Sequence, residues 1–372
     1  MIPRSLTIPE DTKRVVAGFD EMAKRDGLLP IKISDFYAKK VEEEVRVVGG
    51  GVGPLYRCVL PGADRFGVRV RGEVGDFIGD KINMPEELKD VLIWKYDDRV
   101  LFLPTDNCAS NCQYCFRTAY LSDKHGNKPF TLEEKVTKLV EFLREHAQVE
   151  EVILSGGDPM VMAPRDLEMI LGRLKEEGGV ANIRIHSRTL VYSPFVYTEA
   201  CCKMLAKYRV RLVHHIVHPY EICDTVKEHI SRLSAAGVRQ YNQFPLLRNV
   251  NDHIDVLKKL LIELDELGIR NLSIFAPDPV NFSSPFRISL KRQFALMNEL
   301  NWTSPAWIQS TRYALDNPAG KVRREDFVRF EKNADGSGIG IFLRKGKEIL
   351  YPDFPETLDV PGKREVMLWR EA

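Results

Sequence analysis

The chain is 372 residues long, with 44% apolar and 29% charged residues, a composition that is typical of globular proteins and excludes wholesale disorder. Its 54 basic and 53 acidic residues leave a formal net charge of +1, which gives no electrostatic case for binding nucleic acid or an anionic membrane. No apolar run approaches the ~20 residues that span a bilayer, and residues 1–20 lack the apolar stretch of a signal peptide.

The cysteines form a poor disulfide framework, because their number is odd and three of them fall within eight residues. We therefore expect reduced thiols and a cytoplasmic protein. The seven are Cys58, Cys108, Cys112, Cys115, Cys201, Cys202 and Cys223.

Residues 1–94 show scattered charge and a glycine run at 49–51, and we expect an irregular accessory region there. Six short apolar runs follow and predict strands. These are Arg99–Thr105, Glu151–Leu154, Ile183–Ser187, Val210–His215, Val238–Gln243 and Ile269–Phe275.

Amphipathic stretches with helical spacing follow these runs. They are Thr131–Ala147, Arg165–Glu177, Thr198–Tyr208, Asp224–Ala236, Asp252–Leu267 and Ser289–Leu300. The first of them opens with Thr131 and Glu134 at capping-box spacing. Alternating strands and helices predict an α/β fold with a parallel sheet. Six units are too few for a closed eightfold barrel, so we expect a partial, TIM-like (βα)6 barrel over residues 95–301, followed by a C-terminal region over 302–372. A doubly wound open sheet is the alternative.

Polar residues follow the carboxyl end of every predicted strand, which is where parallel α/β folds place their chemistry. We therefore expect one site at this face of the barrel. The residues concerned are Asp106, Asn107 and Cys108, then Ser155 to Pro159, Ser187 and Arg188, His218 and Pro219, Asn242 and Gln243, and Asp278.

The cysteines of the first strand end have the spacing C-x3-C-x2-C. Structural zinc takes four protein ligands, and the first further Cys or His in the sequence is His125, ten residues after Cys115. Three thiolates would instead leave one iron of a [4Fe–4S] cluster open to a substrate or cofactor. Zinc with a distant fourth ligand and three unrelated thiols are the alternatives.

In this setting the sequence resembles the radical S-adenosylmethionine (SAM) enzymes, and more narrowly the lysine 2,3-aminomutase family. The matching stretches occur in order along the chain. They are Tyr96–Leu103, Cys108–Arg117, Leu154–Pro159, His186–Thr189, His218–Glu221, Asn242–Asp252 and Asp316 to Lys321.

The resemblance implies a [4Fe–4S] cluster whose open iron binds SAM. Residues that would hold SAM follow three further strands. On this basis Cys108, Cys112 and Cys115 would ligate the cluster, Ser155, Gly156, Gly157 and Asp158 would receive the methionyl amine, and His218 and Gln243 would make further SAM contacts.

It also implies a second cofactor, pyridoxal phosphate (PLP), bound covalently to Lys321 in the C-terminal region. Lys95, Tyr96 and Arg99 would hold the PLP phosphate, since two cations and a phenol suit a dianion.

Arg117 would bind the substrate carboxylate, and Asp278 and Asp316 are the counterparts of two acidic residues that hold a distal ammonium group. The sequence departs from the family at several points. Lys95 replaces a more usual arginine, residues 118–120 replace a basic run, and the segment before Lys321 is about two residues shorter. No cysteine follows Cys223, so the C-terminal zinc ligands of some members are absent.

We therefore predict a PLP-dependent 2,3-aminomutase that converts an L-α-amino acid to a β-amino acid, with two carboxylates leaning towards a basic substrate such as lysine or arginine. A family member acting on a protein lysine (elongation factor P type), a PLP-independent SAM-dependent rearrangement and a non-catalytic iron–sulfur protein are the alternatives. Expected partners are a small amino acid, a reductant such as flavodoxin or ferredoxin, and further copies of the chain. The amino acid itself stays open.

Overall fold

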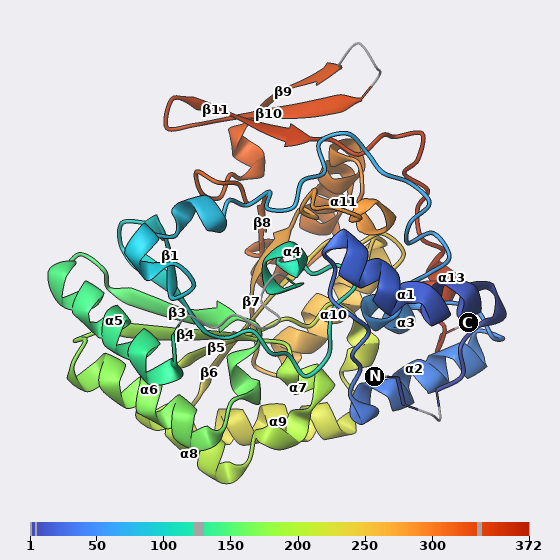
Figure 1. Cartoon of the computed structure of the whole chain (residues 1–372). Coiled ribbons are helices and arrows are strands. Elements are labelled where there is room, and N and C mark those ends of the chain that lie inside the picture. The colour runs from blue at the N-terminus through green and yellow to red at the C-terminus, as the bar shows by residue number, and fades with distance from the viewer. Residues whose placement is uncertain (1, 4–5, 123–129, 333–336, 372) are drawn as a thin grey trace.

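The computed structural model describes residues 2–3, 6–122, 130–332 and 337–371. Its centre is an eight-stranded sheet in which the strands follow one another in sequence order (Figure 1). The first strand, β1 (Leu92–Tyr96), is antiparallel to β2, and every later pair is parallel. The later strands are β2 (Arg99–Thr105), β3 (Glu151–Gly156), β4 (Asn182–Ser187), β5 (Arg211–His214), β6 (Arg239–Pro245), β7 (Arg270–Phe275) and β8 (Arg312–Ala314).

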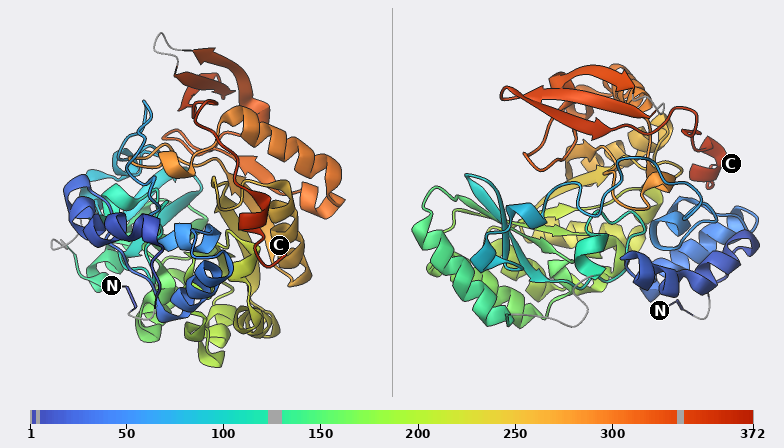
Figure 2. Two further views of the ribbon diagram at one scale, coloured as in Figure 1. Left: turned by 90° about the vertical axis from the view of Figure 1, so that its right-hand side faces the viewer. Right: turned by 45° about the horizontal axis from the view of Figure 1, so that its top comes forward.

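Helices lie along the outside of this curved sheet (Figures 1 and 2). Those between successive strands are α5 (Leu132–Glu145), α6 (Pro164–Glu176), α8 (Glu199–Lys207), α9 (Asp224–Ala235), α10 (Ile254–Glu266) and α11 (Leu290–Thr303), with the short α4 (Thr118–Ser122), α7 (Thr189–Tyr192) and α12 (Ala306–Gln309). The capping box at the start of α5 is present, since Glu134 N donates to Thr131 Oγ1 at 3.3 Å and Thr131 N donates to Glu134 Oε2 at 2.7 Å.

The α/β prediction is confirmed, and the structure contains a strand at each of the six predicted positions. The prediction omitted β1 and β8, which form the two edges of the sheet. β8 has only three residues, too few for the alternation that identifies a strand in sequence. The sheet thus runs from Leu92 to Ala314, and the division of the chain at residues 94 and 301 stays a prediction.

The expectation of an irregular N-terminal region was wrong. It contains α1 (Lys13–Asp26), α2 (Asp35–Val47) and α3 (Pro54–Val59). In α1 the buried side chains are Val16, Phe19 and Ala23, which is the spacing of one helix face. The signal was therefore present, and the glycine run only marks the end of α2.

Two buried side chains join the ends of the chain. The carboxylate of Glu44, on α2, accepts hydrogen bonds from Leu55 N at 2.9 Å and Tyr56 N at 2.7 Å. It also accepts one from Trp369 Nε1 at 3.1 Å, just after the short α13 (Arg364–Met367). The N-terminal helices are thereby fixed to the C-terminal segment, beside which they lie in Figure 1.

A second, antiparallel sheet forms a layer above the barrel opening (Figure 2). Its strands are β9 (Phe327–Lys332), β10 (Gly338–Arg344) and β11 (Lys347–Pro352). Tyr351 is fully buried and donates from its hydroxyl to Pro277 O at 2.7 Å, which fastens this layer to the loop after β7. Within the described part of the chain, no helix is both long enough and apolar enough to cross a membrane.

Candidate active site

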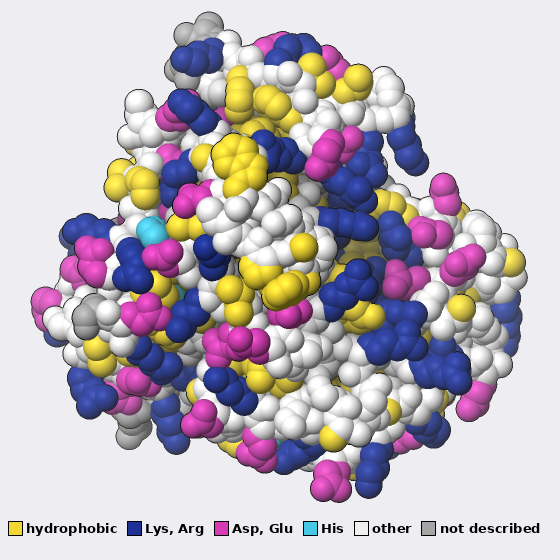
Figure 3. Space-filling model, turned by 180° about the vertical axis from the view of Figure 1, so that it is seen from behind, with side chains coloured by type: hydrophobic (Ala, Val, Ile, Leu, Met, Phe, Trp, Pro, Cys, Tyr) yellow, Lys and Arg dark blue, Asp and Glu magenta, His cyan; other side chains and the backbone are white. Residues whose placement is uncertain are grey.

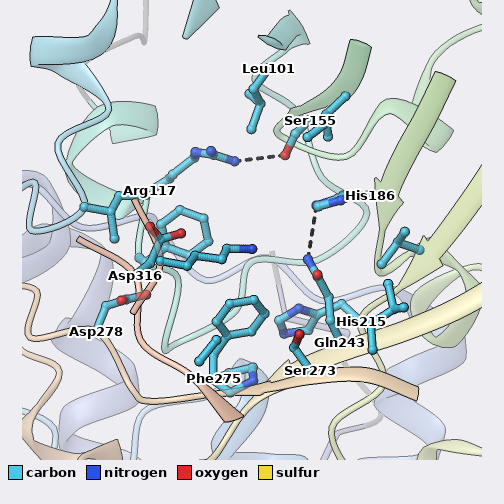
Figure 4. A pocket seen from close by; sticks show the side chains of 18 of the residues that line it. Leu101, Arg117, Ser155, His186, His215, Gln243, Ser273, Phe275, Asp278 and Asp316 are labelled. Atoms are coloured by element: carbon cyan, nitrogen blue, oxygen red, sulfur yellow. Dashed lines mark hydrogen bonds between the residues drawn. The ribbon is translucent and has the colours of Figure 1, made fainter. Parts of the chain in front are cut away.

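A cavity of about 1240 Å³ opens at the carboxyl ends of the barrel strands (Figure 4). It brings together residues that are far apart in the sequence, as predicted for a site at this face. The predicted residues that line it are Lys95, Tyr96, Arg99, Cys108, Cys112, Cys115, Arg117, Ser155, Gly156, Gly157, Asp158, Gln243, Asp278, Asp316 and Lys321. The structure does not bring His218 to the cavity.

The three thiols lie on the loop after β2. Burial raises the pKa of all three above the usual thiol value, to about 12 for Cys115, and neighbouring cysteines add to the shift of Cys108 and Cys115. Such thiols stay protonated until a metal displaces the proton, which is the behaviour of a metal-dependent site. Cys112 Sγ lies 3.1 Å from the hydroxyl of Tyr192, on α7.

This donor set fits an iron–sulfur cluster. Each thiolate in such a cluster binds a different iron, so the sulfurs need not converge on one point. Among the residues that the structure describes, no three Cys, His, Asp or Glu side chains are grouped tightly enough to hold a single metal ion. His125, the nearest candidate for a fourth zinc ligand in the sequence, lies outside the described residues.

The glycine pair after β3 holds the cysteine loop in place. A Cβ atom on Gly157 would lie 2.3 Å from Asn107 O, so only glycine permits this approach. Gly157 N donates to Thr105 O at 2.8 Å and Asp158 N donates to Asn107 O at 2.7 Å. The end of β3 is thus bonded directly to the residues that precede Cys108.

Asp158 lines the cavity, but its carboxylate is also part of the protein framework. It accepts hydrogen bonds from Met160 N at 3.0 Å, Ser187 Oγ at 3.0 Å and Arg188 N at 2.8 Å. Burial raises the pKa of Asp158, and these donors oppose the shift. The carboxylate therefore joins the ends of β3 and β4.

A different histidine takes the place expected for His218. His218 is fully buried, and its Nδ1 accepts from Tyr220 N at 3.2 Å at the start of a 3-10 turn. His215 lines the cavity instead, with its ring 3.3 Å from the hydroxyl of Tyr114. The sequence analysis placed His215 inside the fifth predicted strand. β5 ends one residue earlier, so His215 begins the loop that follows.

The residues behind His215 form a buried ion pair that sequence reasoning missed. Arg188 donates to Glu221 Oε1 at 2.5 Å and to His215 O at 2.5 Å. The same carboxylate oxygen accepts from the hydroxyl of Tyr37 at 2.7 Å. The spacing of these residues along the chain gives no sign of the pairing, because it links four separate elements.

Gln243, at the end of β6, lies in the cavity wall. Its side-chain amide is 3.2 Å from His186 Nδ1, a contact drawn in Figure 4. His186 is a further cavity residue that was not predicted as a site residue, although it lies in a stretch that resembles the family.

Arg117 is held at two points. Its Nε donates to Asp80 Oδ2 at 2.6 Å, and one terminal nitrogen donates to Ser155 Oγ at 2.9 Å (Figure 4). Burial opposes the charge on the guanidinium, but Asp80 offsets it and raises the pKa of Arg117. Two of the five N–H groups of an arginine are used in this way, and the guanidinium is fixed at the cavity wall.

Lys321 follows β8 and lines the cavity. Its Nζ lies 4.5 Å from the centre of the Phe275 ring, and its backbone N donates to the Tyr96 hydroxyl at 3.1 Å. Gly320 precedes it at φ +109°, with the Tyr96 ring against its Cα, so a side chain would be strained there. Burial lowers the pKa of Lys321, which increases the share of neutral, nucleophilic amine that reacts with a carbonyl group. Lys321 thus fits the lysine that holds PLP.

Cations surround Lys321. The guanidinium of Arg99 lies 4.2 Å over the Tyr96 ring, and Arg184 and Arg344 also line the cavity. Figure 3 shows Lys and Arg side chains gathered around a hollow on the back of the molecule. Such a set of cations suits a phosphate group.

Lys95, predicted to hold the PLP phosphate, lines the cavity and is paired there with a carboxylate. Its ammonium donates to Asp316 Oδ1 at 2.7 Å and to Ile78 O at 3.0 Å. Asp316 and Asp278 lie beside each other in the cavity wall (Figure 4). Burial and the nearby charge of Asp316 raise the pKa of Asp278 to about 8.

Comparison with known proteins agrees with this geometry. The family model described as "Radical SAM superfamily" matches residues 102–261. L-lysine 2,3-aminomutase of Escherichia coli (strain K12) is 31% identical over 250 residues, which cover 66% of this chain and 70% of that protein. L-lysine 2,3-aminomutase of Haemophilus influenzae is 30% identical over 292 residues, covering 78% of this chain and 80% of that protein.

A third relative, L-lysine 2,3-aminomutase of Buchnera aphidicola, is 32% identical over 232 residues, which cover 60% of this chain and 66% of that protein. The matched region contains the three-cysteine loop after β2 and the strands β3 to β6. The chain belongs to the lysine 2,3-aminomutase family of the radical SAM superfamily.

Proposed function

We propose that the protein is a PLP-dependent radical SAM aminomutase that moves the amino group of a free L-α-amino acid from Cα to Cβ. The observation that carries this proposal is that the three thiols and Lys321 line one cavity. When bound, the cluster and SAM supply radical chemistry, and PLP supplies the electron sink on which nitrogen can migrate.

The protein residues bind and orient the substrate. Arg117 is held rigidly by Asp80 and Ser155, so its guanidinium can fix a carboxylate near the thiols. Lys321 is the amine that the substrate amino group replaces, and its lowered pKa favours this exchange. Arg344 of β10 and Lys347 and Ile349 of β11 line the cavity, so the second sheet forms part of its wall.

The test uses the anaerobically reconstituted protein with an amino-acid panel, dithionite as reductant, and chromatographic detection of β-amino acids. We expect one amino acid to be isomerised, and an absorbance band from lysine-bound PLP that borohydride bleaches. Lys321→Ala should lose the band and the activity, whereas Lys203→Ala, which changes an exposed lysine on α8, should keep both. A Lys321→Ala protein with a normal isomerisation rate would refute the role of Lys321.

A further inference from the structure

We propose that Lys95 is a built-in cation that occupies the acidic end of the cavity, so that the substrate is an amino acid with an uncharged, polar side chain rather than lysine or arginine. This inference rests on the proposed function and names the substrate class of that site. It differs from the expectation, drawn from the two carboxylates alone, of a basic substrate.

The ion pair between Lys95 and Asp316 carries the inference. The Lys95 ammonium is 2.7 Å from Asp316 Oδ1, and a second of its three donors is used by Ile78 O at 3.0 Å. The side chains are only 9% and 22% exposed, so water and salt screen the pair weakly. A cation from the protein thus already stands where a distal ammonium of the substrate would have to bind.

Asp278 does not supply a second free negative charge. It lies next to Asp316 in the cavity wall, and its charged neighbours are Asp316, Lys95, Asp80 and Lys321. Asp80 is itself paired with Arg117 at 2.6 Å. Burial and the charge of Asp316 raise the pKa of Asp278 to about 8, so this carboxyl group is mostly protonated and neutral near pH 7.

The end of the cavity is therefore close to electrically neutral. A cationic side chain would compete with Lys95 for one ionised carboxylate and would be repelled by it. An anionic side chain would be repelled by the negative charge of Asp316. A hydroxyl or amide group avoids both costs, because protonated Asp278 both donates and accepts hydrogen bonds and Lys95 retains a third N–H.

The experiment compares L-lysine with L-6-hydroxynorleucine, which replaces the distal ammonium by a hydroxyl group at the same chain length. Binding to the PLP-loaded protein is measured by calorimetry without SAM, so that no turnover occurs, and kcat/KM is then measured with SAM. For the unaltered protein we expect the uncharged amino acid to bind at least tenfold more tightly at pH 7 and to be used at least tenfold better.

Two variants test the cause. Lys95→Met removes the charge at similar length and should shift the binding preference at least tenfold towards lysine, because Asp316 becomes free. Lys95→Arg keeps the cation and should keep the preference of the unaltered protein. Raising the pH from 7 to 9 ionises Asp278 and should improve lysine binding to the unaltered protein.

Tighter binding of lysine than of 6-hydroxynorleucine by the unaltered protein would overturn the inference, as would an unchanged preference in Lys95→Met. If Lys95→Met does not fold, Asp316→Asn serves instead and should weaken lysine binding further. If the protein binds 6-hydroxynorleucine more tightly than lysine but forms no β-amino acid, the proposed function is contradicted and the inference of an electrically neutral cavity end is still supported.

Discussion

The hydroxyl of Tyr192 is expected to set the reduction potential of the cluster that the three cysteines would hold. It lies 3.1 Å from Cys112 Sγ, and Tyr192 is only 1% exposed. Hydrogen bonds to cluster sulfurs stabilise the reduced, more negative state. Tyr192→Phe deletes this oxygen and keeps the ring, which packs edge-on against Tyr37 at 4.8 Å.

The size of the effect follows from the charge on the acceptor. A hydrogen bond to a charged group contributes roughly 1 kcal/mol more than one to a neutral group. For a one-electron couple, this difference corresponds to a midpoint potential about 40 mV more negative in Tyr192→Phe. The assay is a redox titration followed by electron paramagnetic resonance, without SAM.

A matched control is Tyr197→Phe. Tyr197 is also fully buried, but its hydroxyl lies 3.3 Å from Ser187 Oγ and contacts no cysteine of the loop. The midpoint potential of the cluster in Tyr197→Phe should stay within about 10 mV of that in the unaltered protein, which is a small fraction of the shift expected when a hydrogen bond to a cluster sulfur is lost. Equal shifts in the two variants, or a more positive potential in Tyr192→Phe, would refute the reasoning.

Three further predictions concern stability. His214 is buried, and burial lowers its pKa to about 4. As the pH falls, the histidine is therefore protonated in the unfolded chain before it is protonated in the folded protein. The contribution of His214 to this effect should lower the free energy of unfolding by up to about 3 kcal/mol between pH 6.5 and 4, measured by urea titration at each pH. Arg292→Met leaves the buried carboxylates of Asp252 and Asp359 without their cation and should cost about 3–5 kcal/mol; a loss below 1 kcal/mol would show that the network contributes little. Thr131→Ala removes the capping box of α5 and should lower the free energy of unfolding by about 1 kcal/mol, whereas Thr131→Ser should keep it.

The central strands could be predicted because they carry buried, mostly apolar side chains between helices, at four consecutive positions in β3 and at every second position in β4. The prediction missed both edge strands. β8 is too short to show a pattern, but β1 opens with an apolar run of Leu92, Ile93 and Trp94, so a signal for it was present in the sequence.

The sequence indicates candidate site residues where they share a local spacing, as in the cysteine loop, or a resemblance, as with Lys321, and the structure places these residues in one cavity. The sequence does not indicate the contacts that the fold creates between side chains of separate elements. Asp80 reaches Arg117 from a loop that precedes β1, and Lys95 reaches Asp316 after β8. His218 was predicted from its place after a strand, and in the structure it turns inward and caps a 3-10 turn away from the cavity lining.

The contact between Glu44 and Trp369 has a consequence for biosynthesis. Trp369 is translated 325 residues after Glu44, so this hydrogen bond forms only once the whole barrel has been translated. A premature stop codon upstream of Trp369 would yield a chain in which the buried carboxylate of Glu44 lacks one of its hydrogen bonds. The helices around Glu44 would then be less stable, and cellular proteases would degrade such a chain more readily.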